Sequence, residues 1–577
     1  MFTTHSIAQQ SETIAEEGDR TVELTFLHTS DVHGSIFSYD YLKQKATSSG
    51  LPFVFSAVDS LRKELGDRLI VTDGGDCLQG QPTAYYYNFV DTVSPHLIAE
   101  VMNQMGYVCS VMGNHDVEAG HPVYDRWVRD LRMPVLGANV VDVRTGKPYL
   151  TPYIIITRAG VRIALLGMVT PGIPFWLPQN LWKGLRFDDI ESSCRQWAKA
   201  IQDAEHPDLL VGIFHSGFNG GIDNELCKEN AAEQVARTVP GFDLILYGHD
   251  HHAAIHEVEC VDGRKVMCMA PTSDAQRYVR ADVSLRYRNG KIAEKRVVPS
   301  LPFVNPQHTG NHDLVAQLFE AEFVDQRLTL GEWVNRKIGE LTRDMDGMDA
   351  YFGPSLFIDF IHQMQLDLTG ADVSLAAPLS YDAIIKAGPM TVSDMFSLYK
   401  YENFLYTMRL TGRELKGLLE MSYGQWVNQM HSPDDHVMLL KPNANGSMFF
   451  ANMTFNFESA AGILYTVDVT RPIGQRITIS SMADGTPFSL DREYRVAVNS
   501  YRGNGGGELL TEGAGIPREE LSSRIITSTG KDLRYLMMQR IQSLGTVTPH
   551  LLNHWRFVPE EWVAPASQRD RAILQKQ

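Results

Sequence analysis

The sequence predicts an α/β protein with two consecutive domains. Its 577 residues exceed the length of one ordinary domain, and a hydrophobic content of 44% is sufficient for a large buried core. In the first half, short apolar runs alternate with amphipathic segments, which is the pattern of a layered α/β domain. Residues 302–312 are rich in proline, asparagine and glycine and predict a linker, and a second α/β pattern begins near Gly331.

Five apolar runs of the first half each end in a loop that carries polar side chains. Runs of this kind, bounded by glycine, predict buried strands. In an α/β sheet, ligands bind at the carboxyl edge of the strands, so the recurrence indicates one binding edge. The runs cover residues 23–29, 68–72, 107–112, 209–214 and 244–247.

The remaining elements follow from periodicity and turn residues. Ser94 is an N-cap candidate for a helix that ends at Met105, and Asn289-Gly290 predicts a hairpin turn. The other predicted helices cover residues 53–65, 188–204, 313–330, 354–367 and 411–424, and the other predicted strands cover 134–141, 153–157, 161–169, 265–270, 278–298, 403–409, 463–469 and 493–499.

These elements predict five segments along the chain. We expect a disordered leader at residues 1–22, a first domain at 23–305 and a linker helix at 306–330. A second domain is expected at 331–558, followed by a polar and loosely held tail at 559–577.

The charge of the chain restricts its partners. The formal net charge is −17 at pH 7, and an acidic surface argues against nucleic-acid polymers and anionic membranes as partners. Metal ions would then supply the local positive charge that an anionic substrate needs. No run of 18 or more apolar residues predicts a membrane span. Residues 1–22 lack the charged-then-apolar plan of a signal peptide, which leaves open a cytoplasmic location or an export signal outside this sequence.

The six cysteines are scattered and form no CxxC pair. Cys260 and Cys268 lie near strand ends and would pair across a hairpin in an oxidising compartment. Buried free thiols fit the same positions, and the sequence leaves both alternatives open.

Seven polar residues in the five loops have the chemistry of metal ligands. Carboxylate, carboxamide and imidazole groups without a thiolate suit Zn²⁺, Mn²⁺ or similar ions. Seven ligands are too many for one tetrahedral ion and suit two ions that share a bridging carboxylate, an arrangement that can clamp a phosphoryl oxygen. Each motif alone has an ordinary explanation, such as a turn or a core histidine, but the recurrence favours a dinuclear site. The residues are Asp31, His33, Asp76, Asn114, His215, His249 and His251.

In this order, Asp31-x-His33, Gly75-Asp76, Gly113-Asn114-His115-Asp116, His215 and Gly248-His249-x-His251 resemble the calcineurin-like metallophosphoesterase superfamily. The length and the second domain are similar to its nucleotidase branch, over roughly residues 23–555. The resemblance implies a layered β-sandwich flanked by helices, a C-terminal α/β nucleotidase domain, and a metal-dependent phosphoric-ester hydrolase. It also implies that one ion is held by Asp31, His33, Asp76 and His251, and the other by Asp76, Asn114, His215 and His249.

The resemblance gives His115 a catalytic role and not a ligand role. The matching histidine of the family donates to the phosphate and protonates the leaving alkoxide, as a general acid does. In one branch a carboxylate three residues later orients this histidine, and here that position is Glu118, a glutamate for the usual aspartate. Asp116 is the alternative partner, and its own alternative role is a helix cap.

The second domain is expected to bind the base of a nucleotide. In nucleotidases of this family two aromatic rings sandwich the base, and such stacking contributes about 1–3 kcal/mol per base. The matching stretches are Phe455-Asn456-Phe457-Glu458 and residues 499–507, in which glycines allow close approach of the backbone. We expect Tyr501, Asn504 and either Phe457 or Phe455 to contact the substrate; alternatively, the two phenylalanines are core residues of a strand.

Several stretches resemble the bacterial 2′,3′-cyclic-nucleotide 2′-phosphodiesterase/3′-nucleotidase branch more than the 5′-nucleotidase branch. The 5′-nucleotidase pattern has Gly-Gly-Gly-x-Arg where this chain has residues 377–381, so a substrate-binding arginine is missing. The cyclic branch has asparagine in place of Glu118. The similar stretches are Tyr39-Asp40-Tyr41, Gly172-Ile173-Pro174-Phe175-Trp176, Ala376-Ala377-Pro378, residues 419–426 and Asn499-Ser500-Tyr501-Arg502.

The leading prediction is therefore hydrolysis of 2′,3′-cyclic and 3′ nucleotides. A 5′-nucleotidase with UDP-sugar hydrolase activity, an enzyme of the related sulfate-ester branch and a non-catalytic nucleotide-binding protein are the alternatives. Loss of a ligand would indicate the last, and none is lost. The resemblance implies a periplasmic or extracellular location, and the oligomeric state is not predicted.

Overall fold

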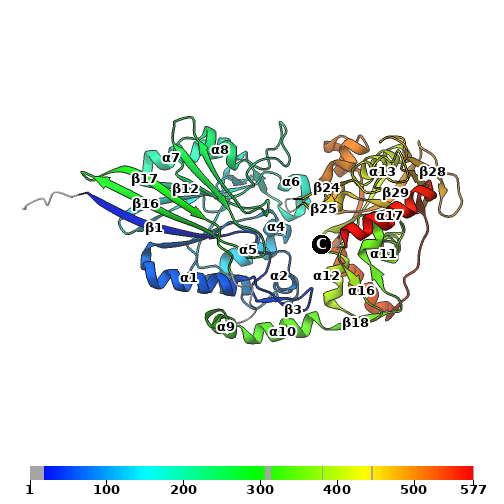
Figure 1. Cartoon of the computed structure of the whole chain (residues 1–577), viewed down its shortest axis with the longest axis horizontal. Coiled ribbons are helices and arrows are strands. Elements are labelled where there is room, and N and C mark those ends of the chain that lie inside the picture. The colour runs from blue at the N-terminus through cyan, green and yellow to red at the C-terminus, as the bar shows by residue number, and fades with distance from the viewer. Residues whose placement is uncertain (1–18, 306–312, 380, 444–445, 576–577) are drawn as a thin grey trace, which may run out of the picture.

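The computed structural model describes residues 19–305, 313–379, 381–443 and 446–575. Figure 1 shows two bodies side by side along the long axis, with the N-terminal half of the chain in one and the C-terminal half in the other. Helices α9 (Leu314–Ala321) and α10 (Val324–Val334) run along one edge and connect the two bodies (Figure 1). The predicted α/β class with two domains is confirmed.

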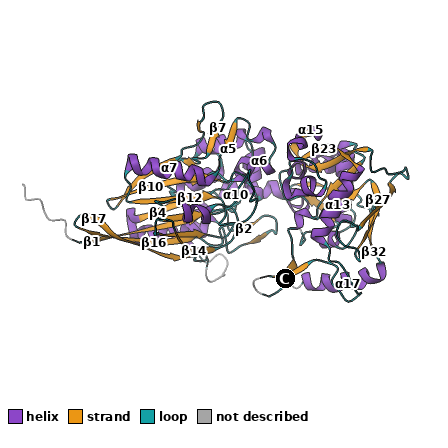
Figure 2. Cartoon of the chain, turned by 90° about the horizontal axis from the view of Figure 1, so that it is seen from above, coloured by secondary structure: helices purple, strands orange, loops and turns teal. Residues whose placement is uncertain are grey.

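Two large sheets form the centre of the first domain. Side chains alternate along the six-stranded sheet: Ile163 and Leu165 face the core shared with the four-stranded sheet, whereas Ala164 and Leu166 face helices α7 (Ile190–Glu205) and α8 (Ala232–Thr238). Figure 2 shows these strands in layers, with α7 on the outer side. In order across each sheet, the strands are β17 (Lys291–Ser300), β16 (Val279–Arg288), β1 (Arg20–Thr29) and β4 (Leu69–Asp73), and β14 (Ala254–Glu259), β15 (Lys265–Ala270), β13 (Leu244–Tyr247), β12 (Leu209–His215), β10 (Val161–Val169) and β9 (Tyr153–Arg158).

The register of the parallel strands brings the polar loops together. Strands β1 and β4 are parallel and pair Thr29 with Asp73, and β12 and β13 are parallel and pair Phe214 with Tyr247. The expected strand at 107–112 is short: only Ser110–Val111 forms β5, which pairs with β6 (Val135–Leu136). The carboxyl ends of these strands open toward the second domain (Figure 1).

Helices of the first domain begin close to their predicted positions, with one exception. Helix α1 covers Leu51–Leu65, and the side chain of Asp189 caps α7 by accepting from the backbone N–H of Ser192. Helix α3 covers Leu97–Met105, so the prediction that Ser94 caps it is wrong. The backbone N–H of Ser94 instead donates to Asp91, which places Ser94 in the preceding turn.

The second domain has its own core around a five-stranded sheet. Helix α11 (Leu356–Thr369) packs against the sheet, and α13 (Gly412–Trp426) begins with a capping box in which Thr411 and Glu414 each accept from the other's backbone N–H. The strands, in order across the sheet, are β26 (Ser459–Ala461), β20 (Val373–Ala376), β29 (Glu493–Asn499), β23 (Phe404–Thr411) and β30 (Ile525–Asp532).

The segments between and around the domains differ from the sequence expectations. The single helix expected at 313–330 is two helices, and α10 continues past Gly331. The ring of Phe319 in α9 stacks on Phe55 of α1 at 4.2 Å, so the linker packs against the first domain. Residues 20–22 of the expected leader belong to β1, whereas residues 1–18 and 306–312 lie outside the described part.

Within the expected loose tail at 559–577, residues 560–574 form a helix, α17 (Glu560–Leu574), so that prediction is wrong. Val563, Ala566 and Leu574 are buried in the core of the second domain. The carboxylate of Asp570 accepts from the backbone N–H groups of Val437 and Met438. Although most residues of the segment are polar, its few apolar side chains pack into the core of the second domain and hold the helix there.

The cysteines are free thiols in this structure, and all six are buried. In the hairpin of β14 and β15, Cys268 lies opposite His256, whereas Cys260 lies at the turn and pairs with Arg264. The alternative of a Cys260–Cys268 disulfide is therefore not observed. Among the described residues, no helix combines the length and apolar character that crossing a membrane requires.

Candidate metal centre

The structure brings all seven predicted ligand residues together at the carboxyl edge of the first domain's strands. Asp31, His33 and His251 form one group, in which one potential ligand atom of each residue lies within 4.8 Å of the others. Asp76, His215 and His249 form a second group by the same measure. Asn114, the first residue of α4 (Asn114–Glu118), joins the second group.

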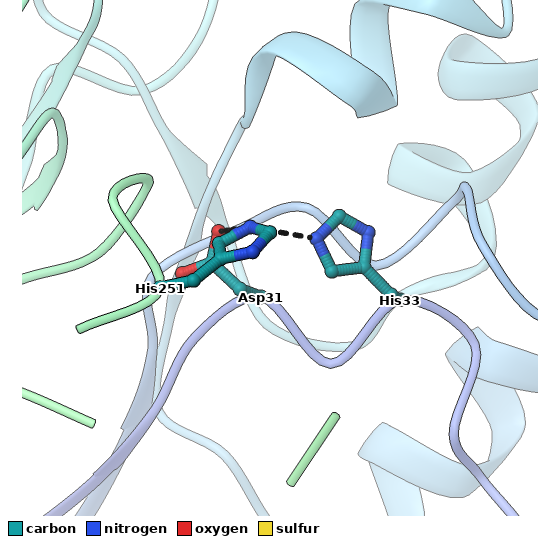
Figure 3. A group of neighbouring side chains, drawn as sticks. All are labelled: Asp31, His33 and His251. Carbon is teal, nitrogen blue, oxygen red and sulfur yellow. Dashed lines mark hydrogen bonds and ion pairs between the residues drawn. The ribbon is translucent and has the colours of Figure 1, made fainter. Parts of the chain in front are cut away.

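In the first group the donor atoms point at one another (Figure 3). The Nε2 atoms of His33 and His251 are 3.1 Å apart, and Nε2 of His251 is 3.3 Å from Oδ1 of Asp31. Two imidazole nitrogens and a carboxylate oxygen that converge in this way match the ligand set of a divalent transition metal.

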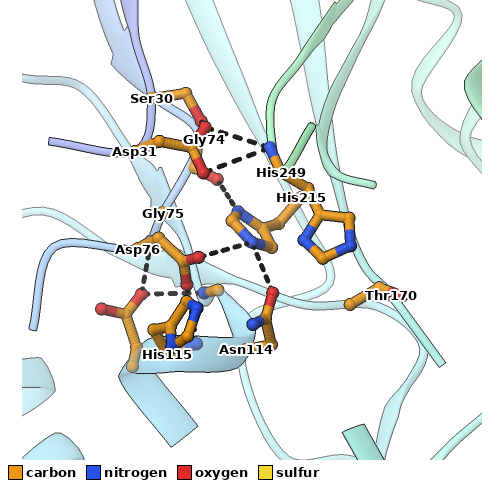
Figure 4. A network of polar contacts seen from close by, with 12 residues as sticks. Ser30, Asp31, Gly74, Gly75, Asp76, Asn114, His115, Thr170, His215 and His249 are labelled. Carbon is orange, nitrogen blue, oxygen red and sulfur yellow. Dashed lines mark hydrogen bonds and ion pairs between the residues drawn. The ribbon is translucent and has the colours of Figure 1, made fainter. Parts of the chain in front are cut away.

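The second group is more deeply buried, and its side chains form a connected network of polar contacts (Figure 4). Nε2 of His215 lies 3.2 Å from Oδ2 of Asp76 and 3.0 Å from Oδ1 of Asn114. Oδ1 of Asp76 accepts from the backbone N–H of His115 at 2.8 Å, and Oδ2 is buried with the imidazole of His215 as its ion-pair partner. Because a buried carboxylate needs a positive partner, this oxygen fits a site that is shared with a cation.

Five of the seven residues have a left-handed backbone. The described part of the chain contains thirteen non-glycine residues with positive φ, and five of them are predicted ligands. Each such conformation costs about 1–3 kcal/mol and persists where the surrounding structure enforces it, which is characteristic of functional sites. The φ angles are 54° for Asp31, 50° for His33, 57° for Asp76, 80° for His249 and 58° for His251.

Two glycines permit the close packing of these loops. A Cβ atom at Gly113 would lie 2.0 Å from Oδ1 of Asp76, and one at Gly248 would lie 1.9 Å from the hydroxyl of Ser30 and 2.6 Å from Oδ2 of Asp31. Neither space accommodates a side chain, so glycine is required at both positions.

The electrostatics of the site favour positive charge. Burial alone would raise the pKa of Asp76, but His215 and His115 hold it well below its usual value. Burial alone would lower the pKa of His215, but Asp76 raises it to about 10. The negative charge of the buried carboxylates must therefore be balanced by positive charge, either from protonated histidines or from metal ions.

His115 lies beside the two groups and is paired with Glu118. Its Nδ1 atom is 2.6 Å from Oε2 of Glu118. Burial acts to lower the pKa of His115, but Asp76 and Glu118 raise it to about 9. The alternative partner, Asp116, makes no such contact: its carboxylate accepts from four backbone N–H groups, those of Gly113, Asp76, Cys77 and Leu78.

The aromatic residues named for base binding lie in two different environments. Phe457 is completely buried, and its ring is parallel to that of Trp426 at 5.7 Å. The structure therefore corrects the expectation for Phe457, which is a core residue. Phe455 and Tyr501 are partly exposed and meet edge to face at 5.8 Å. Asn504 is the C-cap of the short helix α14 (Ser500–Gly503) that carries Tyr501, and its buried Nδ2 atom has no hydrogen-bond partner among the described residues.

Arg502, for which the sequence predicts no role, holds this region together. Its guanidinium is fully buried, pairs with Glu458 at 2.8 Å and donates to the carbonyl oxygen of Phe455 at 3.0 Å. The signal in the sequence was the adjacency of Arg502 to Tyr501 and of Glu458 to Phe457. This ion pair connects the two stretches that were named separately.

A cavity of about 840 Å³ opens between the two domains beside the first group. His33, His115 and His251 line it from the first domain, and Lys400 and Tyr401 line it from the second. The size is sufficient for a nucleotide-sized ligand.

Comparisons with known proteins agree with this arrangement. The model of the calcineurin-like phosphoesterase family matches residues 24–253, and the model of the 5′-nucleotidase C-terminal domain matches residues 337–512. The chain belongs to the 5′-nucleotidase family of calcineurin-like metallophosphoesterases. It is a hydrolase that acts on phosphoric esters. Members of the calcineurin-like group use divalent metals, and the two groups of side chains could hold such ions.

The relatives are distant but extend over most of the chain. The chain is 27% identical to the trifunctional nucleotide phosphoesterase protein YfkN of Bacillus subtilis, over 93% of this chain and 39% of that protein. It is 26% identical to the 2′,3′-cyclic-nucleotide 2′-phosphodiesterase/3′-nucleotidase of Salmonella typhimurium, over 93% of this chain and 89% of that protein. The fold is similar to that of the 5′-nucleotidase precursor of Thermus thermophilus (TM-score 0.62, 20% identity, 93% of this chain and 100% of that chain).

Proposed function

We propose that this protein hydrolyses 2′,3′-cyclic nucleotides and 3′-nucleotides with two divalent metal ions. The observation that carries the proposal is the convergence of seven donor residues into two adjacent groups beside the His115–Glu118 pair. Asp76 contributes one oxygen to the second group and would be the carboxylate that the two ions share. The ions would be Zn²⁺, Mn²⁺ or similar, because the donors are oxygen and imidazole nitrogen.

The side chains divide the chemistry between them. When bound, the ions supply positive charge that stabilises the phosphoryl oxygens and lowers the pKa of water. Glu118 holds Nδ1 of His115, which leaves Nε2 to donate a proton to the departing ribose oxygen. Asp76 and Glu118 raise the pKa of His115 to about 9, which favours the protonated imidazole that this role requires. Water opens the ester bond to the 2′ oxygen, which leaves a 2′-hydroxyl and a 3′-monoester; hydrolysis of the monoester after rebinding gives a nucleoside and phosphate.

Phe455 and Tyr501 are the best candidates for base binding. Both are partly exposed, and Asn504 ends the short helix α14 that carries Tyr501. Their edge-to-face contact leaves no space for a base between parallel rings, so one ring would turn when a base stacks. The two domains would move relative to each other near residues 305–335 to bring the base site and the metal groups together.

The preference for cyclic and 3′ substrates rests on sequence similarity. Relatives named for this activity include the protein of Yersinia enterocolitica, which is 25% identical over 93% of this chain. Residues 377–381 also lack the arginine expected of a 5′-nucleotidase. A 5′-nucleotidase activity, with or without action on UDP-sugars, is the second candidate, because the fold resembles that of the Thermus thermophilus 5′-nucleotidase precursor. If the protein acts outside the cytoplasm, the products would supply phosphate and nucleosides for uptake.

A substrate panel tests the proposal. Protein loaded with Mn²⁺ or Zn²⁺ would be assayed for phosphate release from 2′,3′-cyclic AMP (with added phosphatase), 3′-AMP, 5′-AMP and UDP-glucose, with His115→Ala as the control. The proposal predicts faster turnover of the cyclic and 3′ compounds. Preference for 5′-AMP would establish the second candidate, and no turnover of any compound would contradict a nucleotide substrate.

A further inference from the structure

Two of the imidazoles in the metal groups are oriented by backbone carbonyl groups. Nδ1 of His33 lies 3.1 Å from the carbonyl oxygen of Gln79, and Nδ1 of His215 lies 2.7 Å from that of Gly74. In both residues Nε2 is the nitrogen that faces the other donors. An acceptor at one nitrogen fixes the proton there and leaves the lone pair of the other nitrogen for a metal.

His249 has a different partner. Its Nε2 atom lies 2.9 Å from Oε1 of Glu229, so the acceptor is a carboxylate and not a peptide carbonyl. Both side chains are largely buried, with 11% of His249 and 15% of Glu229 exposed. A hydrogen bond to an ionised acceptor in such surroundings is stronger than one to a neutral group. No role was assigned to Glu229 from the sequence.

Glu229 is itself held firmly, although it lies in the loop between β12 and α8. Its second carboxylate oxygen accepts from the backbone N–H of Ile222 at 2.7 Å, and its own N–H donates to the carbonyl oxygen of Ile222 at 2.8 Å. Its carbonyl oxygen accepts from the hydroxyls of Ser216 at 2.8 Å and Thr170 at 3.1 Å. A side chain fixed at both carboxylate oxygens and along its backbone is preorganised to orient a neighbour.

We propose that Glu229 is a positioning residue for the second metal group. It accepts from Nε2 of His249, fixes the ring orientation and leaves the other ring nitrogen for the ion that Asp76 and His215 would share. A carboxylate partner also makes the imidazole a more basic ligand than a carbonyl partner does. This inference rests on the proposed dinuclear function.

The position of Glu229 decides how it can be tested. Burial raises the pKa of Tyr501 to about 12, and Glu229 is among the negative charges that contribute to this rise. Glu229 therefore lies near a candidate base-binding residue of the second domain. A change in KM of a Glu229 variant would mix the two effects, so the metal must be measured without nucleotide.

Metal affinity is the direct readout. Metal-free protein would be titrated with Zn²⁺ against a chromophoric chelator, with Glu229→Gln compared to Glu225→Gln. Glutamine retains an oxygen for the N–H of Ile222 but cannot keep both carboxylate contacts. Glu225 is exposed on the same loop and gives the same change of charge. We expect affinity for one of two ions to fall about 10–100-fold in Glu229→Gln and to stay unchanged in Glu225→Gln.

A double variant shows whether the effect passes through His249. In a His249→Ala background, Glu229→Gln should cause no further loss of affinity, because its partner is absent. The same loss in both backgrounds, or equal affinity in Glu229→Gln and Glu225→Gln, would overturn the proposal. Wild-type protein that binds fewer than two ions would contradict the proposed function itself, and this result is distinguishable from the other two.

Discussion

The metal groups of the first domain and the aromatic region of the second differ in how the chain prepares them. At the metal groups, five residues hold a left-handed backbone and the donor atoms already converge. In the aromatic region, Phe455 and Tyr501 touch edge to face, and a ring must turn before a base can stack between them. The first region therefore has its donor atoms already in place, whereas the second would have to change shape to hold a base.

This difference follows from the chemistry of the two ligands. A metal ion binds only when several donors stand at short and fixed distances, so the backbone must enforce them. A base binds through a large apolar face and tolerates small displacements. We therefore expect substitutions in the first region to act on rate and metal affinity, and those in the second to act on KM.

The largest effect is expected from Asp76→Asn. The substitution removes the carboxylate that the two proposed ions would share but keeps the size of the side chain. Both ions should therefore bind more weakly, and kcat/KM should fall at least about 1000-fold, or about 4 kcal/mol of transition-state stabilisation. Steady-state kinetics and metal content after dialysis measure this effect. Asp203→Asn, on the exposed face of α7, is the matched control. If Asp76→Asn retained more than a tenth of the wild-type activity, the proposed role of Asp76 at the metal groups would be contradicted.

His115→Gln should lower kcat about 100–10,000-fold without changing metal content, because the variant lacks the acid but no ligand. The effect should depend on the leaving group. A p-nitrophenyl phosphate ester has a leaving group that needs no proton, so its hydrolysis should fall far less than that of 3′-AMP. Equal losses on both substrates would argue against a general acid at His115.

Substitutions at Phe457 and Tyr501 should have different effects: the first should change the stability of the fold, and the second should change substrate binding. Phe457→Ala opens a cavity beside Trp426 and should lower the free energy of unfolding by about 3–5 kcal/mol. Tyr501→Ala removes a partly exposed ring and should raise KM by about 5–150-fold, which corresponds to about 1–3 kcal/mol of stacking. Denaturant unfolding and steady-state kinetics measure the two effects. A large change in KM with unchanged stability in Phe457→Ala would reverse the assignment.

The smallest expected effect is on the pH dependence of stability, and it comes from a histidine in the core of the second domain, away from the metal groups. His362 bonds the hydroxyls of Ser374 and Ser459, and burial lowers its pKa to about 3. The unfolded chain takes up a proton below its ordinary pKa of 6.5, whereas the folded chain does not until about pH 3. Stability is therefore fully present above pH 6.5 and is lost as the pH falls toward 3.

Between pH 7 and pH 5 this residue should cost about 2 kcal/mol of stability, at 1.36 kcal/mol per unit of pH below its ordinary pKa. Urea unfolding of metal-free protein at several pH values measures the loss. His362→Gln should reduce the pH dependence by this amount, and exposed His431→Gln should leave it unchanged. An identical pH dependence in both variants would show that His362 already titrates normally in the folded chain.

The sequence predicted the candidate metal site well because residues of a few types recur at the same position, directly after an apolar run. Aspartate, asparagine and histidine directly after apolar runs are unusual enough in combination to name seven residues that the structure brings together. Their role as ligands stays a prediction. The left-handed backbone at these positions and the contact of Glu229 with His249 depend on loops that are distant in the chain, so no local pattern shows them.

The wrong predictions for Phe457 and for the C-terminal segment each have a structural cause. Phe455 and Phe457 would point the same way on a strand, but residues Thr454–Asn456 form a short 3₁₀ turn, so one ring is partly exposed and the other is buried. In the C-terminal segment, few apolar positions face the core among many polar residues, and composition alone hides the helix. Both errors concern which face of a segment is buried, and tertiary packing decides that.

The most direct test of the account is a crystal structure of protein soaked in Mn²⁺ or Zn²⁺, with metal positions taken from anomalous scattering. The account predicts two peaks, one within ligand distance of Asp31, His33 and His251 and one within ligand distance of Asn114, His215 and His249, with Asp76 in contact with both. A single peak, or peaks away from these residues, would contradict a dinuclear centre.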